Sequence, residues 1–335
     1  MKRNKILIGL AIVFGTVSGC KNSSLELPDF DYQTVYFANQ YPVRTVVLGE
    51  DMNVDNTLDK EHKVEIKATL GGTRNNTENV VIDIEVDNTL LDNLYFPNNG
   101  PKIEPLPANY YSLASDQITI SPGNIMGGVQ IQLTDGFFSD PSAITNTYAL
   151  PLKMKNVQHA DSILSTKDFV LYTLKFINQW HGNYLRRGAD IMTGDVARNV
   201  TRHAAYVEND ELNKLNTRSL HSTAFPIQFR DAEGGNIFSC TLLLDFDQEG
   251  KCTISTNTTG YTATGTGSFV TKGEKNSWGN KDRDALYLDY QVAYSNISVG
   301  SSDDTRIISG NIASKDTLVM RDRAVSPEYI TPVVR

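Results

Sequence analysis

The sequence predicts an all-β protein of two domains, an immunoglobulin-like β-sandwich followed by an antiparallel β-barrel. Short apolar–polar alternations recur along the 335 residues, which is typical of half-buried strands. No long helical period interrupts them, so the strands are joined directly and form antiparallel sheets. The charge balance also changes near residue 175, because acidic side chains clearly outnumber basic ones before it and nearly equal them after it. The length fits about two domains.

Residues 1–19 predict a lipoprotein signal peptide. Three lysine or arginine residues precede an apolar run from Ile6 to Val17, which is too short to cross a bilayer. The small residues Ser18 and Gly19 before Cys20 resemble a bacterial lipobox. The resemblance implies that Cys20 becomes the first mature residue and carries the lipid, so the protein is anchored without spanning the membrane. The alternatives are an ordinary secreted protein cleaved nearby and an uncleaved anchor.

Residues 20–31 are polar and predict a tether, and residues 32–175 predict the sandwich. Seven or eight short strands without long helices are typical of an immunoglobulin-type sandwich. One short helix is expected from Asn88 to Tyr95, ended by Pro97. The predicted strands are 34–37, 45–48, 62–70, 80–86, 117–120, 129–133, 148–154 and 169–176.

Residues 176–335 predict the barrel. Strands joined by short Gly, Asn and Asp turns form an antiparallel meander, and closing such a sheet removes its edges. The predicted strands are 219–224, 237–246, 252–257, 262–270, 285–294, 307–312 and 317–321.

Cys240 and Cys252 are predicted to be buried free thiols. The strand 240–246 and its return 251–255 flank a turn at Asp247–Gly250, which would place Cys252 opposite Asp245. The two sulfurs would then lie about 15 Å apart at 3.3 Å per residue, beyond disulfide reach. A disulfide is the alternative that the predicted envelope location leaves open.

Three ordered segments resemble a module known from other sequences. They are Val86–Tyr95, Leu106–Leu113 and Ile118–Gly123, and Tyr148–Leu152 matches the module's penultimate strand. The module is the N-terminal immunoglobulin-like domain of unknown function of many Bacteroidetes surface lipoproteins, also found ahead of some endo-β-N-acetylglucosaminidases. Two segments of the second half, Trp180–Tyr184 and Leu318–Arg323, look like a lipocalin-like barrel module.

This resemblance implies a glycan-utilisation locus with a TonB-dependent transporter and its partner lipoprotein. It implies an outer-membrane, lipid-anchored protein on the cell-surface face that binds or helps present glycan without catalysis. Surface-exported relatives often carry acidic residues directly after the lipidated cysteine, and here Lys21–Ser24 takes their place. The periplasmic face therefore stays open as an alternative.

Trp278 is the main candidate for ligand contact. It lies in the polar segment 272–282 between two predicted strands, and an exposed indole can stack on the apolar face of a sugar ring. Asn276 and Asn280, in the same loop, are predicted to bind with it. The alternative is that Trp278 anchors the loop on the barrel. Trp180, at the start of a strand, is predicted to lie in the barrel core.

Two rival functions remain at this point. Asp282, Asp284, Asp303 and Asp304 could supply the acid pair of a small glycan hydrolase. The other rival is a structural or assembly lipoprotein that binds a protein partner. Asp245 and Asp247 could form half a calcium loop, but the full ligand pattern is missing and a hairpin turn is expected.

The composition of the chain argues against several classes of binding partner. The net charge is −8 and becomes more negative once the basic leader is removed, which argues against nucleic acid or anionic lipid as a partner. No phosphate-binding loop, dinucleotide fingerprint or zinc-protease motif occurs in the sequence. We therefore expect no cofactor and no metal.

Overall fold

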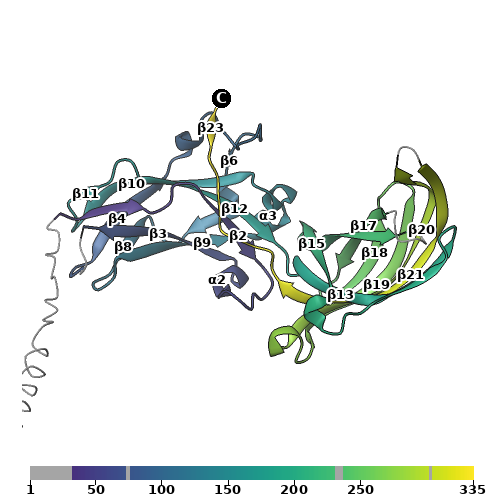
Figure 1. Ribbon diagram of the computed structural model, residues 1–335. Coiled ribbons are helices and arrows are strands. Elements are labelled where there is room, and N and C mark those ends of the chain that lie inside the picture. Colours follow the sequence, from purple (N-terminus) through teal and green to yellow (C-terminus); the bar gives the residue numbers. More distant parts are fainter. Residues whose placement is uncertain (1–31, 73–75, 231–236, 302–303) are drawn as a thin grey trace, which may run out of the picture.

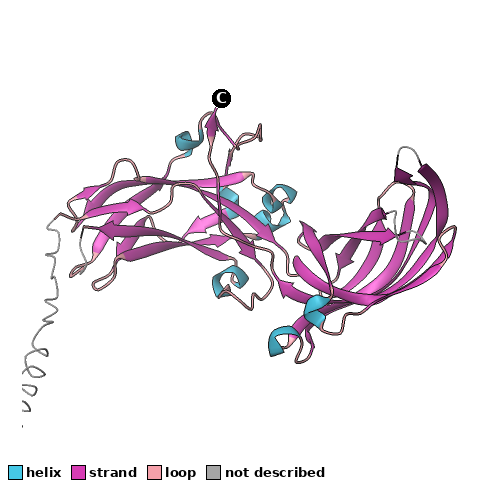
Figure 2. Cartoon of the chain, viewed as in Figure 1, coloured by secondary structure: helices cyan, strands magenta, loops and turns pink. Residues whose placement is uncertain are grey.

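The computed structural model describes residues 32–72, 76–230, 237–301 and 304–335, so the leader, Cys20 and the tether lie outside the described residues. Almost all regular structure within these ranges is strand (Figure 2). The two α-helices are short, α2 (Thr57–Lys60) and α3 (Asp135–Ser139). Single turns of 3₁₀ helix are η1 (Asn88–Leu91), η2 (Ala108–Tyr110), η3 (Pro141–Ile144), η4 (Val207–Asn209) and η5 (Trp278–Asn280). The predicted all-β class is confirmed, and no helix within the described ranges is long and apolar enough to cross a membrane.

The N-terminal domain is a sandwich of two sheets (Figure 1). The first has the order β11 (Ser162–Ile163), β1 (Thr34–Phe37), β3 (Lys63–Gly71), β9 (Met126–Leu133) and β7 (Tyr111–Leu113). The second has the order β22 (Glu328–Tyr329), β2 (Pro42–Val47), β12 (Phe169–Ile177), β10 (Tyr148–Gln158), β4 (Val80–Val86) and β8 (Gln117–Ile120), with β6 (Glu104–Pro105) paired to β10.

The core between these sheets is apolar. Strand β4 shows why, because Val80, Ile82 and Ile84 alternate with outward residues and are each at most 5% exposed. Such a period of two places one apolar face against the facing sheet. Phe137 and Phe138 of α3 pack edge to face against each other, Phe138 packs edge to face against Phe176, and Phe137 meets Phe176 at a tilt.

The C-terminal domain is a nine-stranded antiparallel sheet that curls into a barrel. The first long strand, β13, pairs with β14 and β15 on one side and with the last strand, β21, on the other, so the sheet closes on itself. The order is β14 (Arg198–Arg202), β13 (Gly182–Gly194), β15 (Glu211–Ser219), β16 (Ser222–Arg230), β17 (Ile237–Phe246), β18 (Lys251–Thr256), β19 (Tyr261–Glu274), β20 (Arg283–Ser301) and β21 (Asp304–Asp322).

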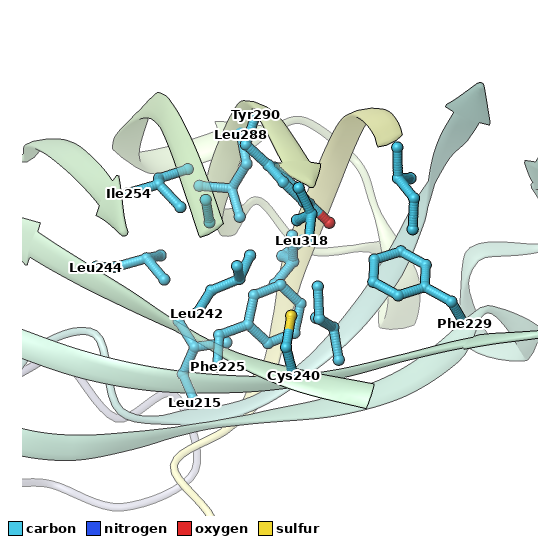
Figure 3. Close-up of a cluster of buried hydrophobic side chains, with 14 of the residues drawn as sticks. Leu215, Phe225, Phe229, Cys240, Leu242, Leu244, Ile254, Leu288, Tyr290 and Leu318 are labelled. Atoms are coloured by element: carbon cyan, nitrogen blue, oxygen red, sulfur yellow. The ribbon is translucent and has the colours of Figure 1, made fainter. Parts of the chain in front are cut away.

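The inward side chains of the barrel form one apolar cluster (Figure 3). Trp180 is 1% exposed and stacks on Phe246 with ring centroids 4.0 Å apart, which confirms its predicted place in the core. Cys240 and Cys252 are free and buried, as predicted, and burial raises the pKa of each thiol to about 12.

The predicted register of the cysteine hairpin is wrong by one residue. Cys252 pairs with Phe246, and Asp245 pairs with Thr253 instead. The Asp247 amide donates to the Lys251 carbonyl oxygen (2.8 Å), so the turn holds three residues, 248–250, one fewer than expected, with Gly250 in the left-handed region at φ +79°. Because a slip of one residue exchanges the two faces of a strand, Cys252 points into the barrel beside Phe246.

The chain does not end in the barrel. After β21 it returns along the sandwich (yellow in Figure 1), where β22 pairs with β2. There β23 (Val333–Val334) also pairs with β5 (Leu94–Tyr95). Ile330, between these two strands, is 7% exposed within a small apolar cluster of the sandwich. The expected barrel domain ran from 176 to 335, and the structure places residues 328–334 on the first domain.

Candidate functional site

The loop between β19 and β20 has a fixed shape set by its own residues. Asn276, Gly279 and Asn280 have φ of 47°, 69° and 54°, the left-handed region that Gly and Asn tolerate best. Asp282 accepts hydrogen bonds from the Asn276 amide (3.0 Å) and the Lys275 ammonium (3.0 Å), which lowers its pKa. Asn276 and Asn280, both predicted ligand contacts, are therefore also favoured by the backbone conformation of the loop.

Trp278 is partly buried at the tip of this loop, not fully exposed as expected. Its Nε1 donates to the carbonyl oxygen of Met320 (3.2 Å). The Arg283 guanidinium lies 3.9 Å from the ring centroid, and Arg283 Nε donates to the Trp278 carbonyl oxygen (3.2 Å). Arg283 is only 4% exposed, so this cation–π contact fixes the indole. One side of the ring is thus occupied by the protein.

A second loop faces the first one. Arg187 of β13 donates from Nε to Asp210 (2.6 Å), and the other oxygen of Asp210 accepts from the Ala204 amide (2.9 Å). The Asp210 carboxylate therefore joins the two ends of the segment 204–210 and ties them to β13. Tyr206 lies within this segment, and its side chain is 67% exposed to solvent. Sequence reasoning missed Tyr206, although an aromatic residue in a polar loop is the signal that selected Trp278.

The two loops enclose a hollow of about 600 Å³, which we call the Trp278 hollow. All three predicted residues, Trp278, Asn276 and Asn280, line it. The remaining lining residues are Arg187, Ala205, Tyr206, Val207, Glu208, Glu274, Lys275, Ser277 and Gly279. The hollow thus offers two aromatic rings, two amides, carboxylates and cations. This set can stack on a sugar ring and exchange hydrogen bonds with its hydroxyls.

The acid pair of a hydrolase is not brought together. Asp284 lies at the start of the 19-residue strand β20, and Asp304 pairs with Ser301 at its other end. Fully extended, such a strand spans roughly 60 Å, whereas glycosidase carboxyls are less than about 10 Å apart. Asp303 lies outside the described residues. Both remaining carboxylates accept hydrogen bonds from their own loop. Asp282 accepts from the Asn276 amide, and Asp284 accepts from the Lys272 amide (2.9 Å).

The acidic turn of the cysteine hairpin has the expected role. Asp247 accepts hydrogen bonds from the amides of Glu249 and Lys251, both at 2.9 Å, which is ordinary turn chemistry. In the described part of the chain, no group of three or more His, Cys, Asp or Glu side chains is placed to hold a metal ion.

Comparison with known proteins places the chain in a family. A domain of unknown function (DUF5627) matches residues 179–324, and a model described as an N-terminal domain matches residues 30–161. A crystal structure of a structural-genomics protein of unknown function from Bacteroides ovatus is 43% identical, with a TM-score of 0.79. The match covers 91% of this chain and all of that one. The chain belongs to the same family as this Bacteroides ovatus protein.

Other similar solved structures are more distantly related to this chain. A Bacteroides ovatus protein of unknown function is 14% identical, with a TM-score of 0.44 over 87% of this chain and 94% of that one. An auxiliary nutrient binding protein from Bacteroides thetaiotaomicron is 14% identical, with a TM-score of 0.37 over 83% and 90%. No curated protein matches the chain.

Proposed function

We propose that the protein binds glycan without catalysis, in the Trp278 hollow. The observation that carries the proposal is the pairing of two aromatic side chains, Trp278 and Tyr206, from separate loops across one polar hollow. Each loop is held by its own hydrogen bonds, so the Trp278 indole and the backbone that carries Tyr206 are positioned before a ligand arrives. The exposed ring of Tyr206 provides a stacking surface on the solvent side.

The separation of the candidate acids supports a binding role over hydrolysis. Hydrolysis of a glycosidic bond needs an acid and a second carboxylate on either side of that bond. Here Asp284 lies at the start of β20, and Asp304, on β21, pairs with the residue at the other end of β20. The hollow itself holds Glu208 and Glu274, and Glu274 accepts a hydrogen bond from the Tyr287 hydroxyl (2.8 Å).

We also propose a cellular localisation and partners for the protein. Cys20 carries the lipid that anchors it to the outer membrane, with the cell-surface face favoured. There it acts beside a TonB-dependent transporter and its partner lipoprotein. The support is the leader sequence and the resemblance of the N-terminal segments to Bacteroidetes lipoproteins. Cys20→Ser should release the protein from membranes, and membrane retention of an unlipidated variant would contradict the anchor.

Affinity electrophoresis against a panel of neutral and acidic polysaccharides tests the binding role, followed by calorimetry on the polysaccharide that binds. Tyr206→Ala and Trp278→Ala should each weaken binding by about 5- to 30-fold, because stacking contributes about 1–2 kcal/mol. Tyr32→Ala is the matched control, since Tyr32 is 61% exposed on the other domain. Tyr206→Ala with unchanged affinity would remove this hollow from the site. If nothing in the panel binds, a protein partner becomes the favoured alternative.

A further inference from the structure

The barrel register places five outward side chains in one row across five neighbouring strands. Lys251 pairs with Ser268, Ser268 with Tyr287, Tyr287 with Thr317, and Thr317 with Arg187. Their chain neighbours are inward residues of the core, such as Cys252, Leu288 and Leu318. Because side chains alternate along a strand, the row itself lies on the outer face. Its four strand spacings amount to about 19 Å along the surface.

A second hollow of about 650 Å³ lies over one end of this row, on the outer face of β17 to β20. Its outward side chains are Asp245, Asp247, Lys251, Thr253, Thr266, Ser268, Tyr287 and Asp289. It combines one aromatic ring with short hydroxyls and carboxylates, which is the side-chain chemistry that accepts and donates hydrogen bonds to sugar hydroxyls. We call it the Tyr287 hollow.

The two hollows meet at one hydrogen bond. The Tyr287 hydroxyl donates to Glu274 Oε1 (2.8 Å). Tyr287 lines the second hollow, and Glu274 lines the Trp278 hollow. Burial and this bond raise the pKa of Tyr287 to about 12, so the hydroxyl keeps its proton at neutral pH. The pair is therefore the boundary between the hollows, and Arg187 and Lys251 mark their far ends.

The charges of the Tyr287 hollow point to a neutral ligand. Three aspartates face it, and its one cation, Lys251, is paired with Glu249 (2.8 Å). Asp289 is paired with Lys315 (3.1 Å). Both this pair and the Lys251–Glu249 pair are exposed, so each is weak and screened by solvent, and three aspartates outnumber the one cation that lines the hollow. A carboxylated or sulfated sugar would meet like charges there, whereas hydroxyl groups would find acceptors.

We propose that a neutral oligosaccharide chain crosses both hollows, passing over Tyr287 between them. The inference rests on the proposed function and extends it, since it makes the ligand a chain of several sugar rings and makes Tyr287 a contact residue. Its support is that the two hollows adjoin at the Tyr287–Glu274 hydrogen bond, and that sugar hydroxyls are complementary to the excess of carboxylates in the Tyr287 hollow.

The test uses oligosaccharides of increasing length, prepared from the neutral polysaccharide that binds best in the panel. Affinity should rise at least about ten-fold from the disaccharide to the hexasaccharide. Tyr287→Ala should weaken the hexasaccharide by about 5- to 10-fold and should remove most of the length dependence. Tyr287→Phe keeps the ring and should stay within about three-fold of the wild type. Gln291→Ala is the control, because Gln291 lies on the outer face of the same strand but outside the hollow.

Salt gives an independent readout of ligand charge. Binding of a neutral chain should change less than about two-fold between low and high ionic strength, since no charges are paired on binding. Strong salt dependence, or preferential binding of acidic polysaccharides, would overturn the neutral assignment. Equal affinities for all chain lengths, together with an unaffected Tyr287→Ala variant, would overturn the extended site while leaving the Trp278 hollow in place. A panel in which no glycan binds would overturn the proposed function as well.

Discussion

The cores of the two domains are built differently. The sandwich buries an apolar cluster between its sheets, with residues such as Val80, Ile82 and Leu152 at or near zero exposure. The barrel buries an equally large apolar cluster and, beside it, one arginine and two aspartates, joined by a second arginine that is partly buried. These charged residues are Arg186, Arg202, Asp190 and Asp316.

The buried charges of the barrel form one connected network. Arg186 Nε donates to Asp316 (2.9 Å), and the Tyr290 hydroxyl donates to the same carboxylate oxygen (2.8 Å). Arg202 bridges Asp316 (2.6 Å) and Asp190, and the Ser314 hydroxyl donates to Asp190 (2.6 Å).

All members of the network come from β13, β14, β20 and β21, the strands that meet where the barrel closes. Apolar residues in their place would often be at least as stable. The comparison therefore suggests that the sandwich core provides stability, whereas the barrel network specifies the register in which the first and last strands join.

The largest expected effect comes from breaking this network at its centre. Asp316→Asn removes the charge that compensates Arg186, which is 1% exposed, and should lower the free energy of unfolding by about 4 kcal/mol. The double variant Arg186→Met, Asp316→Leu should recover most of that loss. Urea unfolding measures both. A double variant as unstable as the single one would show that the network contributes stability beyond charge compensation.

The junction between the domains should make stability depend on pH. His181 is 8% exposed, and its Nδ1 accepts from the Thr217 amide (3.0 Å). Burial, followed by the charges of Lys214, Arg323 and Lys175, lowers its pKa from 6.5 to about 4. Between these pH values the unfolded chain binds a proton that the folded chain does not bind. Stability is therefore complete above pH 6.5 and falls toward pH 4, by about 3 kcal/mol in total.

The variant His181→Gln, whose side-chain oxygen can still accept from Thr217, isolates this contribution. Urea midpoints of the wild type should fall between pH 7 and pH 4.5 by more than those of the variant. Equal falls in both proteins would assign the acid sensitivity to other groups.

Sequence patterns predicted several strands in which one face is uniformly apolar. Val80–Val86 and Ile237–Phe246 were predicted with their observed bounds. Strand β13 was not predicted as a whole, because its inward positions include Gly182, Arg186 and Asp190. Polar residues on the buried face erase the alternation that marks a strand. The charged residues of the network that closes the barrel are therefore also the reason why the pattern did not predict β13.

The sequence predicted the loop that carries the candidate site but not the contacts that shape the site. A lone indole in a polar segment identified the loop 272–282. The contacts that shape the hollow join distant segments, such as Trp278 with Met320 and Arg187 with Asp210, and no local pattern encodes them. The return of the chain to the sandwich was also missed, since β22 and β23 are two residues each and exist only through pairing with β2 and β5.

Removing the returning tail should loosen only the sandwich. A chain ending at Ala324 loses Ile330 from its apolar cluster and the ion pair of Glu328 with Lys175 (2.5 Å). Burial of one isoleucine contributes about 2 kcal/mol, so the sandwich should melt earlier while the barrel keeps its transition. Calorimetry on the full chain and on the shortened chain separates the two transitions. A single transition that shifts as a whole would show that the domains unfold together.

The smallest expected effect concerns Trp278, where the outer loop of the barrel meets its wall. Trp278→Phe keeps an aromatic ring under the Arg283 guanidinium but removes the donor to the Met320 carbonyl oxygen. One hydrogen bond of this kind contributes about 1 kcal/mol, so the barrel should lose about that much stability and the sandwich none. Trp278→Ala should cost more, because the cation–π contact with Arg283 is lost as well. Urea unfolding of both variants measures the difference. Equal stability of the two variants and the wild type would show that the protein does not use the indole to hold the loop, which would leave Trp278 free to serve the ligand alone.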